Sequence, residues 1–109
     1  MKSEEFNAEL KGFSIVRRLE FSVEVGSGAC TLIVELARRD TGNDEVLMVE
    51  FLDVASLSLR DFGGGVTQLL LLHVEDISYQ QLDRRNYKVR DLERESFSFV
   101  CSDFKTDNG

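Results

Sequence analysis

Proline and tryptophan are absent from the 109-residue sequence, which also has only one histidine and two cysteines. Because proline is missing, no β-ladder loses a backbone N–H to it, and turns have to be made by Gly, Asn and Asp. The lack of tryptophan disfavours carbohydrate binding, because sugars stack on flat aromatic faces. One histidine and two cysteines barely supply the nitrogen and sulfur ligands of a zinc site. We therefore expect neither a metal nor another cofactor.

Long apolar runs are lacking as well. The longest, such as residues 69–72, extend over four residues, whereas a membrane-spanning helix needs about 20. The N-terminal segment has no apolar stretch of the kind found in signal peptides. These features predict a cytoplasmic protein that does not bind membranes. In that compartment we expect Cys30 and Cys101 to be reduced and buried as small hydrophobic residues.

Acidic residues outnumber basic ones by 20 to 13, so the formal net charge is −7. Nucleic acid and anionic membranes would repel such a protein, and we expect neither as a partner. The excess lies in residues 41–80, where Arg60 is the only basic residue. Two interpretations stay open, a solubilising surface and a contact face for a basic protein partner. The candidate residues of this acidic face are Asp44, Glu45, Asp53, Asp61, Glu75 and Asp76.

Hydrophobic residues alternate with polar ones over most of the chain, which is typical of β-strands with one buried face. Alternating segments separated by short turns predict one mainly-β domain over residues 1–109. We expect an antiparallel meander of seven or eight strands that forms a sandwich or an open barrel. Ahead of the strands, residues 3–11 predict a short helix, which holds only if Phe6 and Leu10 dock on the core. Residues 105–109 are expected to form a frayed tail.

Two kinds of strand are indicated. Residues 13–25 alternate with a break at Arg17, which predicts one long strand, or two joined by a bend, with Phe21 and Val23 on the core-facing side. Residues 46–54 and 66–74 are instead apolar on both faces. Because strands of this kind are covered on both faces, either they are central in the fold or one face is left for another subunit, as in a homodimer.

Gly63, Gly64 and Gly65 form the most glycine-rich segment of the chain. With Asp61 and Phe62 before it, Gly63 completes the metal-binding tripeptide of protein kinases, but the other kinase motifs are missing. No Gly-Lys-Ser/Thr follows, so the segment is not a phosphate-binding P-loop. We expect a turn or bulge or, in a functional role, a flexible rim that lets the backbone of a partner approach closely.

Candidate catalytic groups are few. His73 lies in an apolar stretch, where a hydrogen-bonded structural role is the ordinary one. A Cys–His pair would need Cys30 or Cys101 beside it, and no feature of the sequence brings them together. No catalytic residue is therefore predicted.

A group of acidic residues near the C-terminus has an alternating spacing. We expect it to be a solvated strand edge, paired with neighbouring arginines and Lys88 and protected in this way against aggregation. The residues are Asp91, Glu93 and Glu95.

A pattern of strand and turn residues runs from about residue 46 to residue 104. It comprises residues 51–59, then Phe62-Gly63-Gly64 and Gln68, Asp76-Ile77-Ser78, Tyr87-x-Val-x-Asp91, and Phe97-Ser-Phe-x-Cys-x-Asp103-Phe104. This pattern resembles small bacterial β-rich domains of the YxiG-like and immunity-protein-50-like families. The resemblance implies an antidote that is encoded beside a contact-dependent or polymorphic toxin. Its motifs are those of a fold, so no site residue is carried over.

Three functions follow from these observations. We favour a non-enzymatic protein-binding module, in the concrete form of an immunity-type antidote that binds a basic toxin through its acidic face. One alternative is a homo-oligomeric structural or scaffolding domain, which the strands with two apolar faces support. The other is a small-ligand-binding β-sandwich or an enzyme acting through carboxylates. Because the sequence contains no recognisable nucleophile–base pair, we do not expect an enzyme.

Overall fold

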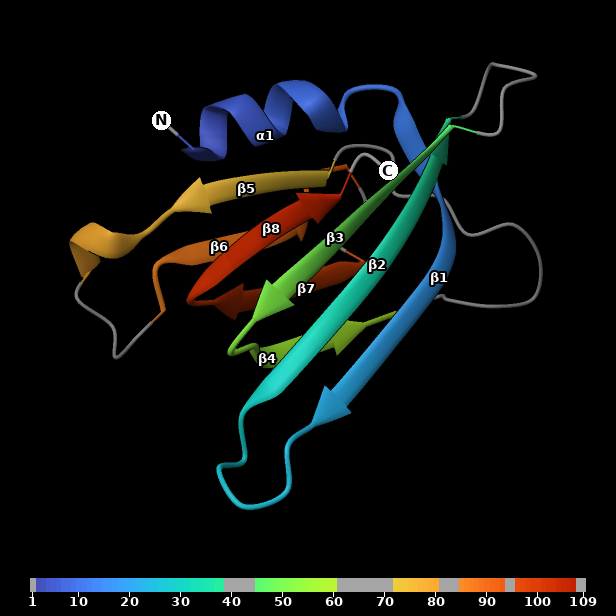
Figure 1. Cartoon of the computed structure of the whole chain (residues 1–109). Helices are drawn as coiled ribbons and strands as arrows, with labels where there is room; N and C mark the ends of the chain where they lie inside the picture. The colour runs from blue at the N-terminus through green and yellow to red at the C-terminus, as the bar shows by residue number, and fades with distance from the viewer. Residues whose placement is uncertain (1, 39–44, 61–71, 81–84, 94–95, 108–109) are drawn as a thin grey trace.

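The computed structural model describes residues 2–38, 45–60, 72–80, 85–93 and 96–107 (Figure 1). Within these ranges a helix, α1 (Lys2–Leu10), precedes eight strands and a short 3₁₀ helix, η1 (Ser78–Gln80). The strands are β1 (Phe13–Val23), β2 (Cys30–Arg38), β3 (Val46–Leu52), β4 (Ala55–Leu59), β5 (Leu72–Asp76), β6 (Tyr87–Asp91), β7 (Phe97–Cys101) and β8 (Asp103–Asp107). The predicted glycine rim at 63–65 and most of the predicted strand at 66–74 lie outside the described residues.

The strands form two four-stranded antiparallel sheets, ordered β1-β2-β3-β8 and β4-β7-β6-β5. The two sheets face each other across one hydrophobic core (Figure 1). Chain neighbours pair within β1-β2-β3 and within β5-β6-β7, whereas β4 joins β7 and β8 joins β3. The prediction of a mainly-β antiparallel fold is confirmed as a two-sheet sandwich. The pairing between the described strands does not close it into a barrel.

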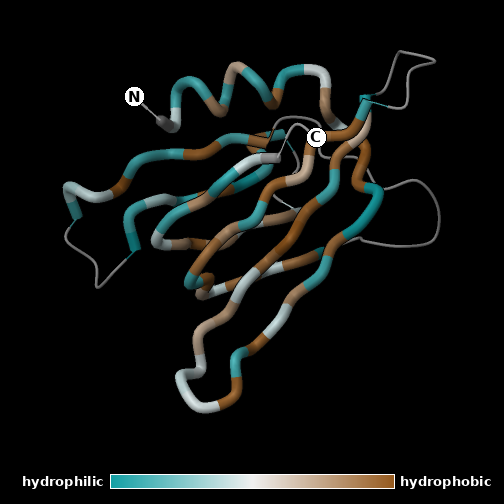
Figure 2. The backbone as a smooth tube through the Cα atoms, viewed as in Figure 1, coloured by the Kyte–Doolittle hydropathy of each residue, from teal (hydrophilic) through white to brown (hydrophobic). Residues whose placement is uncertain are grey.

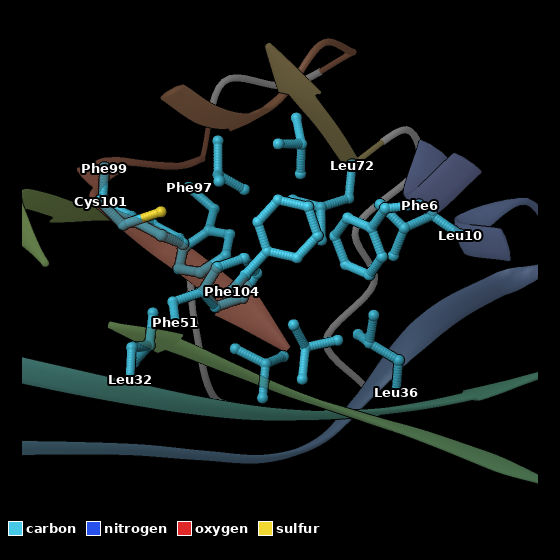
Figure 3. Close-up of a cluster of buried hydrophobic side chains, with 14 of the residues drawn as sticks. Phe6, Leu10, Leu32, Leu36, Phe51, Leu72, Phe97, Phe99, Cys101 and Phe104 are labelled. Carbon is cyan, nitrogen blue, oxygen red and sulfur yellow. The ribbon is translucent and has the colours of Figure 1, made fainter. Parts of the chain in front are cut away.

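Phenylalanine rings occupy the centre of the core (Figure 3). Phe51 of β3 is fully buried, and its ring centroid lies 4.8 Å from that of Phe99 on β7. The two sheets therefore meet at this contact. Phe104 of β8 lies 4.6 Å from Phe6 of α1, also measured between ring centroids. Full burial of one such side chain stabilises the fold by about 1.5–3 kcal/mol. Phenylalanine therefore supplies the bulky side chains of a core that contains no tryptophan.

Helix α1 closes one side of the sandwich, above β5 and β8 in Figure 1. Phe6 and Leu10 are buried, as predicted, because residues four apart lie on the same face of a helix. The helix begins one residue before the predicted range and ends at Leu10. Gly12 follows with a φ of 93°, a left-handed conformation that glycine adopts without steric cost and that commonly ends helices.

The far end of β1 is more exposed than predicted. β1 is one strand, the first of the two predicted alternatives, and its pairing with β2 shifts in register between Val16 and Arg18, at the predicted break. Beyond this shift, Phe21 pairs with Leu32 and so faces the core side of the sheet, yet Phe21 and Val23 are 43% and 58% exposed. The physical reason is that β1 is an edge strand and the β1–β2 hairpin extends past the second sheet (Figure 1). Alternation indicates which side a residue faces, but not whether another layer covers it.

Strand β3 is apolar on both faces, as predicted. Its inner residues Leu47, Val49 and Phe51 are buried, whereas Val46 and Met48 on the outer face are half-buried. Figure 2 colours much of the central part of this sheet as hydrophobic. The outer face of the first sheet is therefore a partly exposed surface with an apolar component.

Candidate partner-binding surfaces

The predicted acidic residues that the structure describes do not all gather into one patch. Glu45 immediately precedes β3 and Asp53 directly follows it, so the length of a seven-residue strand, about 23 Å, separates them. Figure 1 shows the two ends of β3 at opposite corners of the sheet. Glu75 and Asp76 end β5, in the other sheet. Two further predicted residues lie outside the described ranges, Asp44 and Asp61.

Asp53 and Asp76 nevertheless lie at the same end of the sandwich, because a relay of backbone hydrogen bonds of 2.8–2.9 Å connects their strands. The relay consists of Ser102 N–H donating to Leu52 C=O, Asn86 N–H to Cys101 C=O, and Ile77 N–H to Asn86 C=O. Asp103 is exposed at this end too, since it begins β8 and pairs with Leu52. We call Asp53, Glu75, Asp76 and Asp103 the acidic end.

Asp103 is the member of the acidic end that sequence reasoning missed. Residues 81–109 carry equal numbers of acidic and basic side chains, so their composition does not mark any of them as part of an acidic surface. Only the pairing of β8 with β3 places Asp103 beside the end of β3. A contact between segments this far apart in sequence has no local signal.

The carboxylates of the acidic end differ in their surroundings. Asp76 accepts hydrogen bonds from the hydroxyl of Ser78 at 2.6 Å and from its backbone N–H at 2.9 Å. These bonds favour the charged form and hold the pKa of Asp76 below its ordinary value. Asp53 instead lies 4.0 Å from Nη1 of Arg85, a distance at which the cation offsets part of its charge. Asp76 therefore presents the less compensated negative charge.

A row of polar side chains crosses the outer face of the second sheet. Arg90 of β6 lies directly opposite His73 of β5 on one side and Ser98 of β7 on the other. Ser98 is in turn opposite Ser58 of β4. Because directly opposite residues of antiparallel strands share a face, these four side chains form one line over all four strands.

Two more basic residues extend this line into a basic surface. Lys88 lies two residues before Arg90 and hence on the same face of β6. Arg60, just after β4, lines the same shallow hollow, whose volume is about 390 Å³. We call the residues that line this hollow the basic row: Ser58, Arg60, Lys88, Arg90 and Ser98.

Asp91 is buried, which corrects the predicted solvent-exposed acidic edge. It is 0% exposed because it lies opposite Leu72 on the inner face of the sheet. Its Oδ1 accepts a hydrogen bond from the backbone N–H of Glu93, so the side chain caps the turn that follows β6. Glu93 is exposed and Glu95 lies outside the described residues. Asp91 therefore lies on the opposite face of β6 from Lys88 and Arg90, two of the basic residues expected to pair with it.

Lys88 and Arg90 form no ion pair with any described carboxylate, including Glu75 directly opposite Lys88. The four ion pairs within the described ranges involve Arg18, Arg38, Arg85 and Lys105. The Nε of Arg90 is buried and has no hydrogen-bond partner among these residues. Two cations on one face are thus left without a described counter-charge.

The cysteine and histidine side chains do not form a Cys–His pair. Cys101 is fully buried on the inner face of the second sheet, whereas His73 lies on the outer face of the same sheet. Cys30 belongs to the first sheet. Neither thiol forms a disulfide, and the predicted burial is complete for Cys101 and partial for Cys30. The described residues include no cluster of three His, Cys, Asp or Glu side chains suited to a metal.

A second hollow lies on the outer face of the first sheet. Its volume is about 230 Å³, and it is lined by Ile33, Met48, Glu50, Lys105 and Thr106. Nζ of Lys105 lies 3.3 Å from Oε1 of Glu50, so the charges lining this hollow are paired. The remaining lining residues, Ile33, Met48 and Thr106, carry no charge, unlike the cations of the basic row.

The molecule is a two-sheet β-sandwich closed by one helix, and its acidic end and basic row offer charges of both signs for contact with other proteins. The family described as "Immunity protein PIM8" matches residues 2–107, so the chain belongs to this family of immunity proteins. The expectation of an immunity-protein family is thereby confirmed. No curated protein and no solved structure matches the chain. Helix α1, the one α-helix in the described ranges, is neither long nor apolar enough to cross a membrane.

Proposed function

We propose that this protein is an antidote that neutralises a toxin by binding it, without catalysing a reaction of its own. The observation that carries this proposal is the family match, which extends over residues 2–107. A sandwich with charged outer surfaces supports it, because such surfaces can engage a protein partner directly. The free cysteines are consistent with a cytoplasmic site of action, where thiols stay reduced.

We further propose that the toxin is basic and that the acidic end contacts it. Opposite charges on two partners accelerate their encounter and favour the correct partner. Asp53, Asp76 and Asp103 meet at one end of the sandwich, whereas Glu45 lies at the other end of β3 and its Oε2 accepts a hydrogen bond of 2.8 Å from Nε of Arg38. Asp44, Asp61 and the glycine rim at 63–65 stay predictions of the sequence.

The test begins with the protein encoded by the neighbouring gene. Co-expression should protect cells against that protein, and the two should co-purify. The triple variant Asp53→Asn, Asp76→Asn, Asp103→Asn removes three charges without a change of shape. Asn also tolerates the positive φ of 57° at Asp53. We expect association to slow about tenfold at low salt, since surface charges act mainly on the association rate.

A matched control removes the same number of charges elsewhere. Glu9, Glu20 and Glu35 lie on α1, β1 and β2, and their replacement by Gln changes the net charge equally. This variant should bind nearly as fast as the unmodified protein. Equal slowing by both variants would assign the effect to net charge alone, and binding that is insensitive to salt would contradict a basic toxin.

A second copy of the chain is the other partner that we propose, through the outer face of the first sheet. The supporting observation is that apolar Ile33 and Met48 line a hollow on this face and are only half-buried. A homodimer formed there would leave the acidic end and the basic row open to a toxin.

A further inference from the structure

We propose that the basic row is a second binding surface, which receives a carboxylate-rich segment of the protein partner. This inference rests on the proposed antidote function and adds the chemistry of a part of the toxin. It concerns the outer face of the second sheet, where Glu75 of the acidic end lies directly opposite Lys88 and marks the boundary between the two surfaces.

The paired strands hold the residues of the basic row at fixed spacing. Ser58, Ser98 and Arg90 stand side by side on three hydrogen-bonded strands, so the sheet fixes their spacing before any partner binds. Arginine presents a planar fork of N–H donors that matches a carboxylate with two parallel hydrogen bonds. Serine hydroxyls add neutral donors beside it. Because their backbone is already held in paired strands, these residues lose little conformational entropy when a partner binds.

Lys88 and Arg90 lack a counter-charge among the described residues. The chain has 20 acidic residues and 13 basic ones, so there are enough carboxylates to pair with every cation. Lys88 and Arg90 nevertheless form no ion pair within the described ranges, and none joins Lys88 to Glu75 directly opposite it. A buried N–H without a partner, such as Nε of Arg90, costs free energy. A carboxylate brought by the partner offsets this cost once the guanidinium turns toward it.

The net charge and the size of the hollow indicate which anionic group binds. A nucleic acid is disfavoured because its long run of phosphates would meet the net charge of −7 beyond the basic row. The hollow of about 390 Å³ holds a few side chains rather than a long polymer. A short acidic segment gains the attraction of Arg60, Lys88 and Arg90 without extending into the acidic surroundings. Among anionic groups of partners, carboxylates of a protein fit this surface best.

The direct test is a titration of the ¹⁵N-labelled protein with a hexaglutamate peptide, followed by amide chemical shifts. We expect saturable shifts at Ser58, Lys88, Arg90 and Ser98 that weaken with added salt. Inorganic phosphate and a single-stranded DNA oligonucleotide serve as competing probes, and both should bind more weakly. The proposal is overturned if hexaglutamate leaves these amides unmoved, or if phosphate or the oligonucleotide binds them more tightly.

The double variant Lys88→Gln, Arg90→Gln should bind hexaglutamate and the toxin at least about tenfold more weakly. Each ligand loses charge-assisted hydrogen bonds to the two replaced side chains. The matched control Lys11→Gln, Arg17→Gln removes two exposed cations outside the second sheet and should leave both affinities within about threefold. Circular dichroism checks the fold. The single variant Lys88→Gln changes an exposed side chain and should give an intermediate loss.

The outcomes separate this inference from the proposed function. If the toxin binds the unmodified protein and the Lys88→Gln, Arg90→Gln variant equally, the basic row is not a contact surface, while the antidote function stands. If the toxin does not bind the unmodified protein at all, the proposed function fails. The peptide titration then still decides whether the basic row binds carboxylates.

Discussion

At the scale of single residues, Asp76 illustrates how one neighbour sets the charge of a candidate contact. The hydroxyl and the backbone N–H of Ser78 both donate to its carboxylate, and the pKa of Asp76 is lowered as a result. Because the folded-state pKa lies below the unfolded one, this contribution to stability is complete above the unfolded pKa. It is lost as the pH falls through the folded pKa.

Ser78→Ala should therefore raise the pKa of Asp76 partway toward its ordinary value, since the backbone N–H of residue 78 still donates. Folding stability should then be lower above about pH 4 and fall less steeply with acid, because a smaller difference between the folded and unfolded pKa leaves less stability to lose. An NMR titration of the side-chain carboxyl carbon measures the pKa directly. Ser58→Ala removes a serine hydroxyl from β4 and should leave the titration of Asp76 as it was. An unchanged pKa in Ser78→Ala would show that the hydroxyl does not hold the charge.

Asp91 shows why the prediction of side-chain environment failed at one residue. The alternation of Tyr87 and Val89 already placed Asp91 on the inner side of its strand. The prediction of a solvated acidic edge rested instead on the general rule that carboxylates are solvent-exposed. In the structure the alternation holds, and Asp91 is buried where the strand ends and its side chain caps a turn. A pattern of period two was more informative here than residue type.

At the scale of elements, Asn7 joins α1 to the edge of the second sheet. Its Nδ2 donates to the C=O of Val74, and the N–H of Val74 donates to its Oδ1, both at 2.8 Å. The side-chain amide therefore takes the place of a neighbouring strand beside β5, an edge strand. Covering an edge in this way protects it against pairing with another chain.

Asn7→Ala should lower the free energy of unfolding by about 1–3 kcal/mol, because it leaves partly buried backbone groups of Val74 without partners. Asn7→Asp should not restore this loss, since a carboxylate cannot donate to the C=O of Val74. Urea denaturation followed by circular dichroism gives the values. Glu9→Ala, at an exposed position of the same helix, should stay within about 0.5 kcal/mol of the unmodified protein. Equal urea midpoints for Asn7→Ala and Glu9→Ala would contradict the role of Asn7.

The elements themselves were largely predictable from local pattern, but their partners were not. Phe6 and Leu10 predicted the docked helix, and the break in alternation at Arg17 coincides with a register shift in the pairing of β1. The contact of Asn7 with Val74 connects residues 67 positions apart, and β8 returns to pair with β3. Such contacts depend on the path of the whole chain. The acidic end and the basic row both depend on them, which is why neither was assembled in advance.

At the scale of the whole molecule, composition and folding give different views of charge. A net charge of −7 suggested an acidic protein with one acidic face. The fold instead separates Glu45 from the acidic end and gathers Arg60, Lys88 and Arg90 on one outer face. A partner that meets both surfaces needs patches of both signs. Such a pattern discriminates among partners better than a single charge sign does.

The outer face of the first sheet completes this division of surfaces and yields the last prediction. If two copies associate through Met48 and its apolar neighbours, light scattering after size-exclusion chromatography should give about twice the chain mass of 12.4 kDa. Met48→Lys should return the protein to a monomer, because it puts two like charges into the interface while its methylene stem still covers the sheet. Val23→Lys, on the exposed end of β1, should leave the dimer intact. A monomer at high concentration of the unmodified protein would rule out the dimer. The acidic end and the basic row would then be the surfaces left to account for binding, since neither needs a second copy.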